Sequence, residues 1–298
     1  MGKISKAFEK AEKNIHKDDL KVGSTEKDNS RDAAPGLSKE NLVREKYLSE
    51  AIQEPEDNYS KAEVVPENGS NELITISKPF SIVSEQFRLL KTNILFPETG
   101  EPPRTIMITS PSPHEGKSFV AGNLAVSIAQ SIDEYVLLMD CDLRHPSIHS
   151  LFGLDGSEQG LSEYLSSGLS LSSVLKKTFV KKLTILPGGS IPSNPSELLS
   201  SEQMRRMLHE VKLRYRDRYI IIDTPPPYIT SETNAIARYV DGIIIVVRHG
   251  KTRIKEVQDI VDIYGKNKIL GVIKNFSQKS IGYGYGYHKY GYGYHKQT

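Results

Sequence analysis

Residues 105–130 read TIMITSPSPHEGKSFVAGNLAVSIAQ, and this stretch decides the fold class. A short β-rich run comes first, a polar loop follows it, and a run with helical spacing comes directly after the loop. A loop between a strand and the start of a helix directs backbone N–H groups and the helix dipole at one point, which suits a phosphate group. The stretch therefore predicts a phosphate-binding loop.

The loop is a variant of the P-loop pattern G-x-x-x-x-G-K-[ST], in which Pro111 replaces the first glycine. In this pattern Lys117 reaches the β- and γ-phosphates of a nucleotide, and the Ser118 hydroxyl is a ligand of Mg²⁺. The letters G-K-S alone are common by chance. The flanking strand and helix, and two aspartate-ended strands further on, are what make ATP with Mg²⁺ the expected ligand.

The two later strands are VLLMDCDLR and YIIIDTPPP, which supply Asp140, Asp142 and Asp223. Ligands of open α/β folds bind at the carboxyl ends of the strands, where these carboxylates are expected. Asp140 and Asp142 are two residues apart, so in an extended chain both project to the same side. One carboxylate is then free to accept a proton while the other serves the metal. A single strand-end aspartate is often only a cap or turn residue, but three beside a P-loop favour a site.

Short apolar runs alternate with helical stretches from about residue 73 onward. This alternation predicts an α/β fold with a mainly parallel, doubly wound sheet flanked by helices. The predicted strands are Thr105–Thr109, Val136–Asp140, Leu183–Leu186, Tyr219–Asp223, Gly242–Val247 and Leu270–Lys274, and two predicted helices are Phe119–Ser131 and Ser200–Tyr215.

The two ends of the chain differ from this central part. Apolar residues recur at helical spacing in MGKISKAFEKAEKNI, which predicts an amphipathic helix that docks either on its own domain or on a partner or membrane surface. The following polar, charged stretch is typical of a flexible linker. The expected organisation is thus a helix over 1–16, a linker over 17–72, a P-loop domain over 73–280 and a Gly/Tyr-rich tail over 281–298.

Composition excludes several classes of protein. The net charge of +2 gives no indication of a nucleic-acid partner. One cysteine, Cys141, allows no intramolecular disulfide and no cysteine-rich metal site. No apolar run reaches the roughly 18 residues that span a bilayer, and the N-terminus lacks the apolar core of a secretion signal. A cytoplasmic location is expected, with any membrane association made through a partner.

The chain resembles the bacterial tyrosine kinases (BY-kinases) that control polysaccharide polymerisation and export, and in particular the soluble autokinases of exosortase-associated exopolysaccharide loci. The resemblance covers roughly residues 77–277, together with the tail and the N-terminal helix. It depends on motifs that occur in order, namely SEQFRLLKTNILF, ITSPSPHEGKS, VLLMDCDLRHP, LPGGSIPSNPSELL, YIIIDTPPP, DGIIIVVR and GVIKN.

The resemblance assigns roles to individual residues. It implies catalysis by Lys117, Asp140 and Asp142, with Asp140 as the base that accepts the tyrosine proton. It implies Mg²⁺ binding by Ser118, Asp142 and Asp223. Asn275 falls where relatives contact the adenine, and Arg144 matches an arginine of the family. The expected ATP contacts are His114, Glu115, Gly116, Lys117, Ser118, Phe119 and Asn275.

Two positions depart from the family pattern. Relatives usually carry glycine where this chain has His114, and glycine permits a positive φ and close backbone approach. Relatives also use an E-x-x-R-x-x-R helix at the subunit interface, which corresponds here to Glu85, Arg88 and Lys91. Replacing the last arginine by lysine removes a bidentate fork. The three side chains share one helix face, so a solvated ion-pair face is the alternative interpretation.

The tail GYGYGYHKYGYGYHK carries the expected phosphate acceptors, Tyr283, Tyr285, Tyr287, Tyr290, Tyr292 and Tyr294. Interleaved glycine disfavours a stable helix, and a flexible tail of this length reaches roughly 20–25 Å, enough to enter a neighbouring subunit's site. A low-complexity segment or a base-stacking tail is the alternative interpretation. The resemblance further implies a homo-oligomer, a membrane chain-length-determinant protein as activator, and a cognate tyrosine phosphatase.

Two other functions compete with an autokinase. A partition-type positioning ATPase has the same fold, but its signature K-G-G-x-G-K-[ST] requires a lysine where this chain has Ser112. A non-catalytic scaffold that changes shape with ATP is the second alternative, and His114 and Lys91 keep it open.

Overall fold

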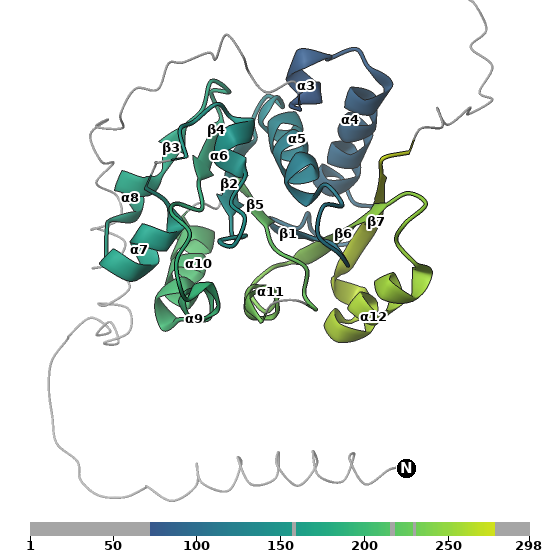
Figure 1. Cartoon of the computed structure of the whole chain (residues 1–298). Coiled ribbons are helices and arrows are strands. Elements are labelled where there is room, and N and C mark those ends of the chain that lie inside the picture. The colour runs from purple at the N-terminus through teal and green to yellow at the C-terminus, as the bar shows by residue number, and fades with distance from the viewer. Residues whose placement is uncertain (1–71, 157–158, 215–217, 229–230, 278–298) are drawn as a thin grey trace, which may run out of the picture. The chain divides into compact units, whose positions relative to one another are not determined.

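A seven-stranded sheet forms the centre of the protein (Figure 1). The structure is a computed structural model, and it describes residues 72–156, 159–214, 218–228 and 231–277. The strand order is β3-β4-β2-β5-β1-β6-β7. All neighbouring strands pair in parallel except β3 and β4, which are antiparallel. The predicted α/β fold with a mainly parallel, doubly wound sheet is therefore confirmed.

The strands are β1 Thr105–Thr109, β2 Tyr135–Asp140, β3 Lys176–Lys177, β4 Leu183–Leu186, β5 Arg218–Asp223, β6 Gly242–Arg248 and β7 Ile269–Asn275. All six predicted strands are present, with ends that agree to within one residue. The edge strand β3 was not predicted, because two residues are too few to show a periodic pattern.

The helices are α3 Ile74–Ser77, α4 Ile82–Leu95, α5 Lys117–Ala129, α6 Ile148–Leu151, α7 Leu161–Ser167, α8 Leu171–Val174, α9 Pro195–Leu199, α10 Glu202–Arg214, α11 Glu232–Ile236 and α12 Ile254–Tyr264, with a 3₁₀ turn, η1, at Lys266–Lys268. The predicted helix over Phe119–Ser131 begins two residues earlier in the structure, at Lys117, and ends at Ala129.

Helices cover both faces of the sheet and bury two apolar cores (Figure 1). Side chains of α4 and α5 pack on one face against residues such as Ile106 and Val136. Side chains of α10, α11 and α12 pack on the other face against residues such as Met107 and Leu137. Alternate residues of each strand point to opposite faces, so strands covered on both faces must be apolar throughout. This explains the continuous apolar runs in the sequence.

The expected N-terminal helix over 1–16, the linker up to residue 71 and the tail over 281–298 lie outside the described residues. Leu73 is 2% exposed and belongs to the core beneath α5, so packed structure begins at the start of the described part. No helix of the described part is long and apolar enough to cross a membrane.

Candidate active site

The loop that follows β1 has an unusual backbone shape. His114 has φ 60° and Gly116 has φ 88°, so both lie in the left-handed region. Glycine adopts this region freely, whereas histidine pays a conformational cost there. The residue at which relatives usually carry glycine thus has the positive φ that glycine permits. Histidine therefore adopts at this position a backbone conformation that glycine favours.

Gly116 is required where the loop meets the end of β7. A Cβ atom added at Gly116 would lie 2.0 Å from Nδ2 of Asn275, far inside contact distance. The same Nδ2 donates a hydrogen bond of 3.0 Å to the carbonyl oxygen of Glu115. Asn275 therefore holds the loop backbone directly, in addition to lining the cleft described below. Any larger residue at 116 would displace this amide.

Lys117 begins α5 and is almost buried, with 7% of its surface exposed. Its Nζ lies 3.9 Å from Oδ2 of Asp142. Burial raises the pKa of Asp142, and the lysine charge acts against that rise. The predicted approach of Lys117 to the carboxylates is thus present in the structure.

Asp140 and Asp223 end adjacent strands and face each other in register. Both are fully buried. Burial, together with the charge of Asp223, raises the pKa of Asp140 to about 8, although the backbone N–H groups of Ile148 and Ser147 donate to its Oδ2 at 3.0 and 2.8 Å. Burial likewise raises the pKa of Asp223 to about 6, with Lys117 acting in the opposite direction. Like charges in one low-dielectric site cannot both ionise freely.

A cleft of about 670 Å³ opens beside these groups. It separates the two carboxylates that the resemblance placed in catalysis, because Asp142 lines the cleft whereas Asp140 lies behind it, fully buried. Strand β2 ends at Asp140, and Asp142 follows in the loop, where its backbone N–H donates to Oδ1 of Asp140 at 3.2 Å. The cleft is lined by Glu72, Pro113, His114, Gly116, Lys117, Ser118, Phe119, Asp142, His145, Ser147, Asn275 and Phe276.

The remaining expected ATP contacts divide into two groups. Ser118 and Phe119 line the cleft, and the Ser118 hydroxyl accepts a hydrogen bond of 2.8 Å from the hydroxyl of Ser147. Glu115 is different, since it is only 3% exposed and its carboxylate accepts from the N–H of Ser112 at 3.2 Å and from the hydroxyl of Thr252. Its side chain thus faces away from the cleft, and only its main chain is available to a ligand there.

Arg144 is held by side chains of two helices, α11 and α9. Its Nε donates to Oε1 of Glu232 at 3.1 Å, and its Nη2 donates to the hydroxyl of Ser196 at 3.2 Å. Glu232 is 1% exposed, so this ion pair fixes a buried carboxylate near the strand ends.

The expected interface residues lie on α4. Arg88 donates to Oε2 of Glu85 at 2.6 Å and to the carbonyl oxygen of Pro79 at 2.5 Å, within the same chain. The helix-face spacing predicted from the sequence is therefore correct for this pair. Exposed apolar side chains flank it, including Ile82 at 66% and Leu89 at 59% exposure. The expected acceptor tyrosines lie outside the described residues.

Sequence reasoning missed several residues of this region, among them Ser147, Glu232, Thr252 and Phe276. Phe276 lines the cleft with φ 57°, and the Arg248 guanidinium lies 4.5 Å from its ring centroid. Each missed residue stands outside a recognised motif or just beyond one, so spacing along the chain gives no signal for it. Only the parallel strand order brings these loops to one edge.

Comparison with known proteins gives the family. A model of the ParA family described as "NUBPL iron-transfer P-loop NTPase" matches residues 103–284. "Tyrosine-protein kinase YwqD" of Bacillus subtilis is 36% identical over 72% of this chain and 90% of its own length. The chain belongs to the bacterial tyrosine-protein kinases. This confirms the resemblance drawn from the motifs, and it places these kinases on a ParA-type P-loop NTPase fold.

Two further likenesses agree with this membership. The solved kinase domain of the Escherichia coli tyrosine kinase ETK is 30% identical, with a TM-score of 0.62 over 80% of this chain and 91% of that one. "Tyrosine-protein kinase wzc" of Salmonella typhimurium is 32% identical over 74% of this chain, but the match spans only 30% of wzc. This chain thus matches only one part of wzc, which is a longer protein, whereas it matches nearly the whole of YwqD.

Proposed function

We propose that this bacterial tyrosine kinase is an ATP-dependent autokinase that phosphorylates the tyrosines of its own tail and thereby regulates exopolysaccharide polymerisation and export. The observation that carries the proposal is the arrangement of Lys117, Asp142 and Asp223 around the phosphate loop. Lys117 and Asp142 both line the cleft and lie 3.9 Å apart, and the charge of Lys117 also acts on the fully buried carboxylate of Asp223. Positioning and charge neutralisation of this kind are the main needs of phosphoryl transfer.

The residues present fit ATP with Mg²⁺. Both carboxylate oxygens of Asp223 are buried without a hydrogen-bond partner among the described residues, which is costly unless a cation or donor satisfies them. In the part of the chain described, no three His, Cys, Asp or Glu side chains could hold a metal together. Magnesium is usually held by one or two carboxylates plus phosphate oxygens and water. Ser118 and Asp223 are the residues that would hold it directly here, which leaves Asp142, the third ligand that the resemblance implies, free to accept a proton.

When bound, Mg–ATP supplies an activated terminal phosphoryl group. The phosphorus–oxygen bond to ADP breaks, a bond to the tyrosine Oη forms, and the phenol proton passes to a carboxylate. Lys117 offsets negative charge in the nearly buried cleft. Asp142 lines the cleft and is the better placed acceptor of the proton. Burial and the charge of Asp223 raise the pKa of Asp140, so this carboxyl group holds a proton more readily than an ordinary one in the free protein, and positive charge near Asp223 would lower that pKa.

The tail supplies the proposed acceptors, Tyr283, Tyr285, Tyr287, Tyr290, Tyr292 and Tyr294. The last described residues before it, Phe276 and Ser277, follow β7, and Phe276 lines the cleft. The last described residues before the tail therefore include one that lies at the proposed site. Each phosphotyrosine adds about −1.5 to −2 charge, so several would make a mildly basic tail strongly negative and drive neighbouring tails apart.

The wider setting is proposed from the family pattern. We propose a homo-oligomer that uses Glu85, Arg88 and Lys91 of α4, and a cytoplasmic location at the inner face of the membrane through a chain-length-determinant partner. A cognate tyrosine phosphatase would reverse the modification. Iron transfer, named in the description of the matching family model, is not part of the proposal, because the one cysteine, Cys141, is buried.

The test is incubation of the purified chain with Mg–ATP, followed by mass spectrometry of tail phosphotyrosine. Wild type should label the tail, Lys117→Met should abolish labelling, and Asp142→Asn should reduce it by roughly 10²–10⁴-fold. Asp140→Asn separates the two carboxylates, since a larger loss there than in Asp142→Asn would make Asp140 the base. A control with all six tail tyrosines changed to phenylalanine should bind ATP normally.

The competing functions give different results in the same assay. A scaffold gated by ATP would bind Mg–ATP without labelling the tail, even with the membrane partner's cytosolic segment added. A positioning ATPase would release phosphate steadily with no phosphotyrosine. Either result contradicts the autokinase.

A further inference from the structure

Glu115 is a buried carboxylate within the phosphate loop that does not face the proposed ligand. We infer that Glu115 and Thr252 are positioning residues that tie the phosphate loop to the segment between β6 and α12 and set its shape for nucleotide binding. This inference rests on the nucleotide site proposed above and adds the contact that holds the loop from behind.

The tie has a defined direction of hydrogen bonding. The N–H of Arg248 donates to the Thr252 hydroxyl oxygen at 2.8 Å, and the Thr252 hydroxyl donates to Oε1 of Glu115. The other carboxylate oxygen, Oε2, accepts from the N–H of Ser112 at 3.2 Å. One side chain therefore bonds both to the first half of the loop and to a residue 137 positions away.

The loop needs such support because its backbone is not relaxed. His114 and Gly116, on either side of Glu115, both have positive φ. Left-handed conformations of non-glycine residues persist only where surrounding contacts determine them. A hydrogen bond to a buried charged group is among the stronger polar contacts in a protein, and leaving such a carboxylate without its donor is costly. Glu115 is 3% exposed, so water replaces a lost donor poorly.

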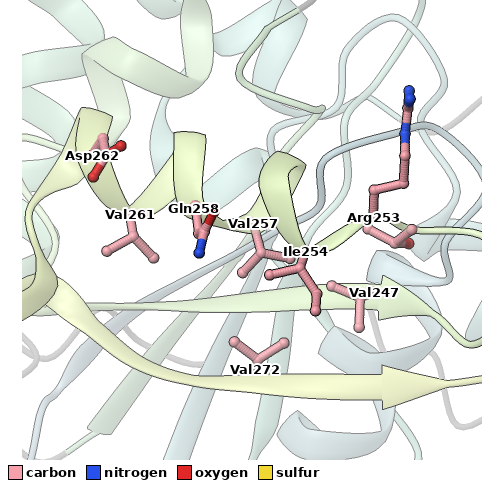
Figure 2. Close-up of a pocket in the computed structure, with 9 residues that line it drawn as sticks. Val247, Arg253, Ile254, Val257, Gln258, Val261, Asp262 and Val272 are labelled. Atoms are coloured by element: carbon pink, nitrogen blue, oxygen red, sulfur yellow. The ribbon is translucent and has the colours of Figure 1, made fainter.

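Thr252 is placed where it can act on the loop without contacting a nucleotide. It is absent from the residues that line the phosphate cleft, and it lines instead a groove of about 370 Å³ beneath the start of α12. Figure 2 shows this groove, with Ile254 and Val257 of α12 above Val272 of β7. The hydrogen bond from Thr252 to the loop goes to Glu115 and Thr252 does not line the phosphate cleft, so we assign it as a positioning residue and not as a ligand of the phosphates.

The experiment compares Thr252→Val, which keeps the branched shape and removes the hydroxyl, with Thr252→Ser, which keeps the hydroxyl. Calorimetry measures the dissociation constant for Mg–ADP in the full-length protein, and hydrogen–deuterium exchange measures protection of the loop over 110–117. We expect about tenfold weaker binding for the valine variant, faster exchange in the loop with β1 unchanged, and recovery to within about twofold in the serine variant. The melting temperatures of both variants should stay close to wild type.

Several results would overturn the inference. Wild-type affinity and wild-type loop exchange in Thr252→Val would do so, as would equal losses in both variants. A loss of affinity that only follows a lower melting temperature would reduce Thr252 to a structural role and also overturn it. The exchange measurement needs no nucleotide, so a wild-type protein that binds no Mg–ADP would refute the proposed function while the tie itself was still tested.

Discussion

His114 stands where relatives usually carry glycine, and the backbone of the phosphate loop has a positive φ at this residue. Its φ of 60° is the conformation that glycine adopts at least cost, and the structure retains it with histidine. The cost of a non-glycine residue in the left-handed region is about 1–2 kcal/mol. That cost must be met by contacts around the loop, among them the bonds to Glu115.

Changing His114 to glycine should therefore be tolerated and should favour the bound shape of the loop. We expect His114→Gly to bind Mg–ATP as tightly as wild type or up to about fivefold more tightly, and His114→Ile to bind at least tenfold more weakly, because β-branched residues resist positive φ. Binding of a fluorescent ATP analogue measures both. Equal affinity in glycine and isoleucine variants would show that the backbone at this position does not matter.

The buried carboxylate of Asp223 makes the free protein sensitive to pH. Its pKa is about 6 in the folded state, above its ordinary value of 3.8. A raised pKa means that the folded state holds the proton more tightly than the unfolded state does. The stabilisation is complete below about pH 4 and is lost as the pH rises to about 6.

Asp223→Asn should consequently be more stable than wild type at pH 8, by on the order of 1–3 kcal/mol, and the difference should shrink toward pH 4. Chemical denaturation at both pH values in the absence of nucleotide measures this. The same variant should lose Mg²⁺-dependent ATP binding. If the difference in stability between Asp223→Asn and wild type does not vary with pH, the pKa of Asp223 is not raised in the folded protein, whatever the binding result.

At the scale of the elements, α4 combines an internal ion pair with an exposed apolar surface. The Glu85–Arg88 pair is 60% and 39% exposed, so it contributes little to the stability of the monomer. Phe80 and Ile82 next to it are 97% and 66% exposed. Large exposed apolar groups beside charged ones are typical of a surface that binds another protein.

Arg88→Ala should therefore leave the melting temperature within a few degrees of wild type while shifting the protein toward smaller assemblies. Lys91→Arg should shift it the other way, because the guanidinium restores a bidentate fork. Sedimentation velocity over a range of concentrations measures both, with Gln86→Ala on the exposed side of the same helix as the matched control. If Arg88→Ala and Gln86→Ala sediment alike, α4 is not the interface.

The elements that could be predicted from sequence are those whose residues carry a period or a motif. Strands β1 and β5 are buried at nearly every position because both faces are covered, and their apolar centres allowed their ends to be predicted almost to the residue. Helix α5 starts at Lys117, two residues before the prediction, because Gly116 in the left-handed region allows the chain to turn directly into the helix. Strand β3 is defined only by its pairing with β4, which no local pattern encodes.

At the scale of the whole molecule, the candidate site is made by strand order. Lys117 begins α5, Asp142 lies in the loop after β2 and Asp223 ends β5, and β2 and β5 become neighbours only in the folded sheet. Their residue types and positions at strand ends were visible in the sequence, and so the cluster could be predicted. That Asp142 lines the cleft whereas Asp140 is fully buried depends on where β2 ends, and this difference could not be predicted.

A tail can be phosphorylated either by its own subunit or by a neighbouring one, and an experiment can separate these two routes. Phe276 lines the cleft, and Tyr283 is seven residues further on, an extended span of roughly 23–25 Å. A tail of that reach is long enough for its own site as well as a neighbour's, so chain length alone does not favour transfer between subunits. Assembly through α4 would favour it by raising the local concentration of foreign tails.

Mixing two variants separates the two routes. A Lys117→Met protein keeps its tail but should not phosphorylate it, and a protein with all six tail tyrosines changed to phenylalanine keeps the site but has no acceptor. If transfer occurs between subunits, incubating the two together with Mg–ATP should label the tail of the Lys117→Met protein, and adding Arg88→Ala to both should reduce that labelling several-fold by weakening assembly. Labelling that is strong in wild type at dilutions where sedimentation shows only monomer, and absent from the mixture, would instead establish transfer within one chain, since a monomer has no neighbouring subunit in reach.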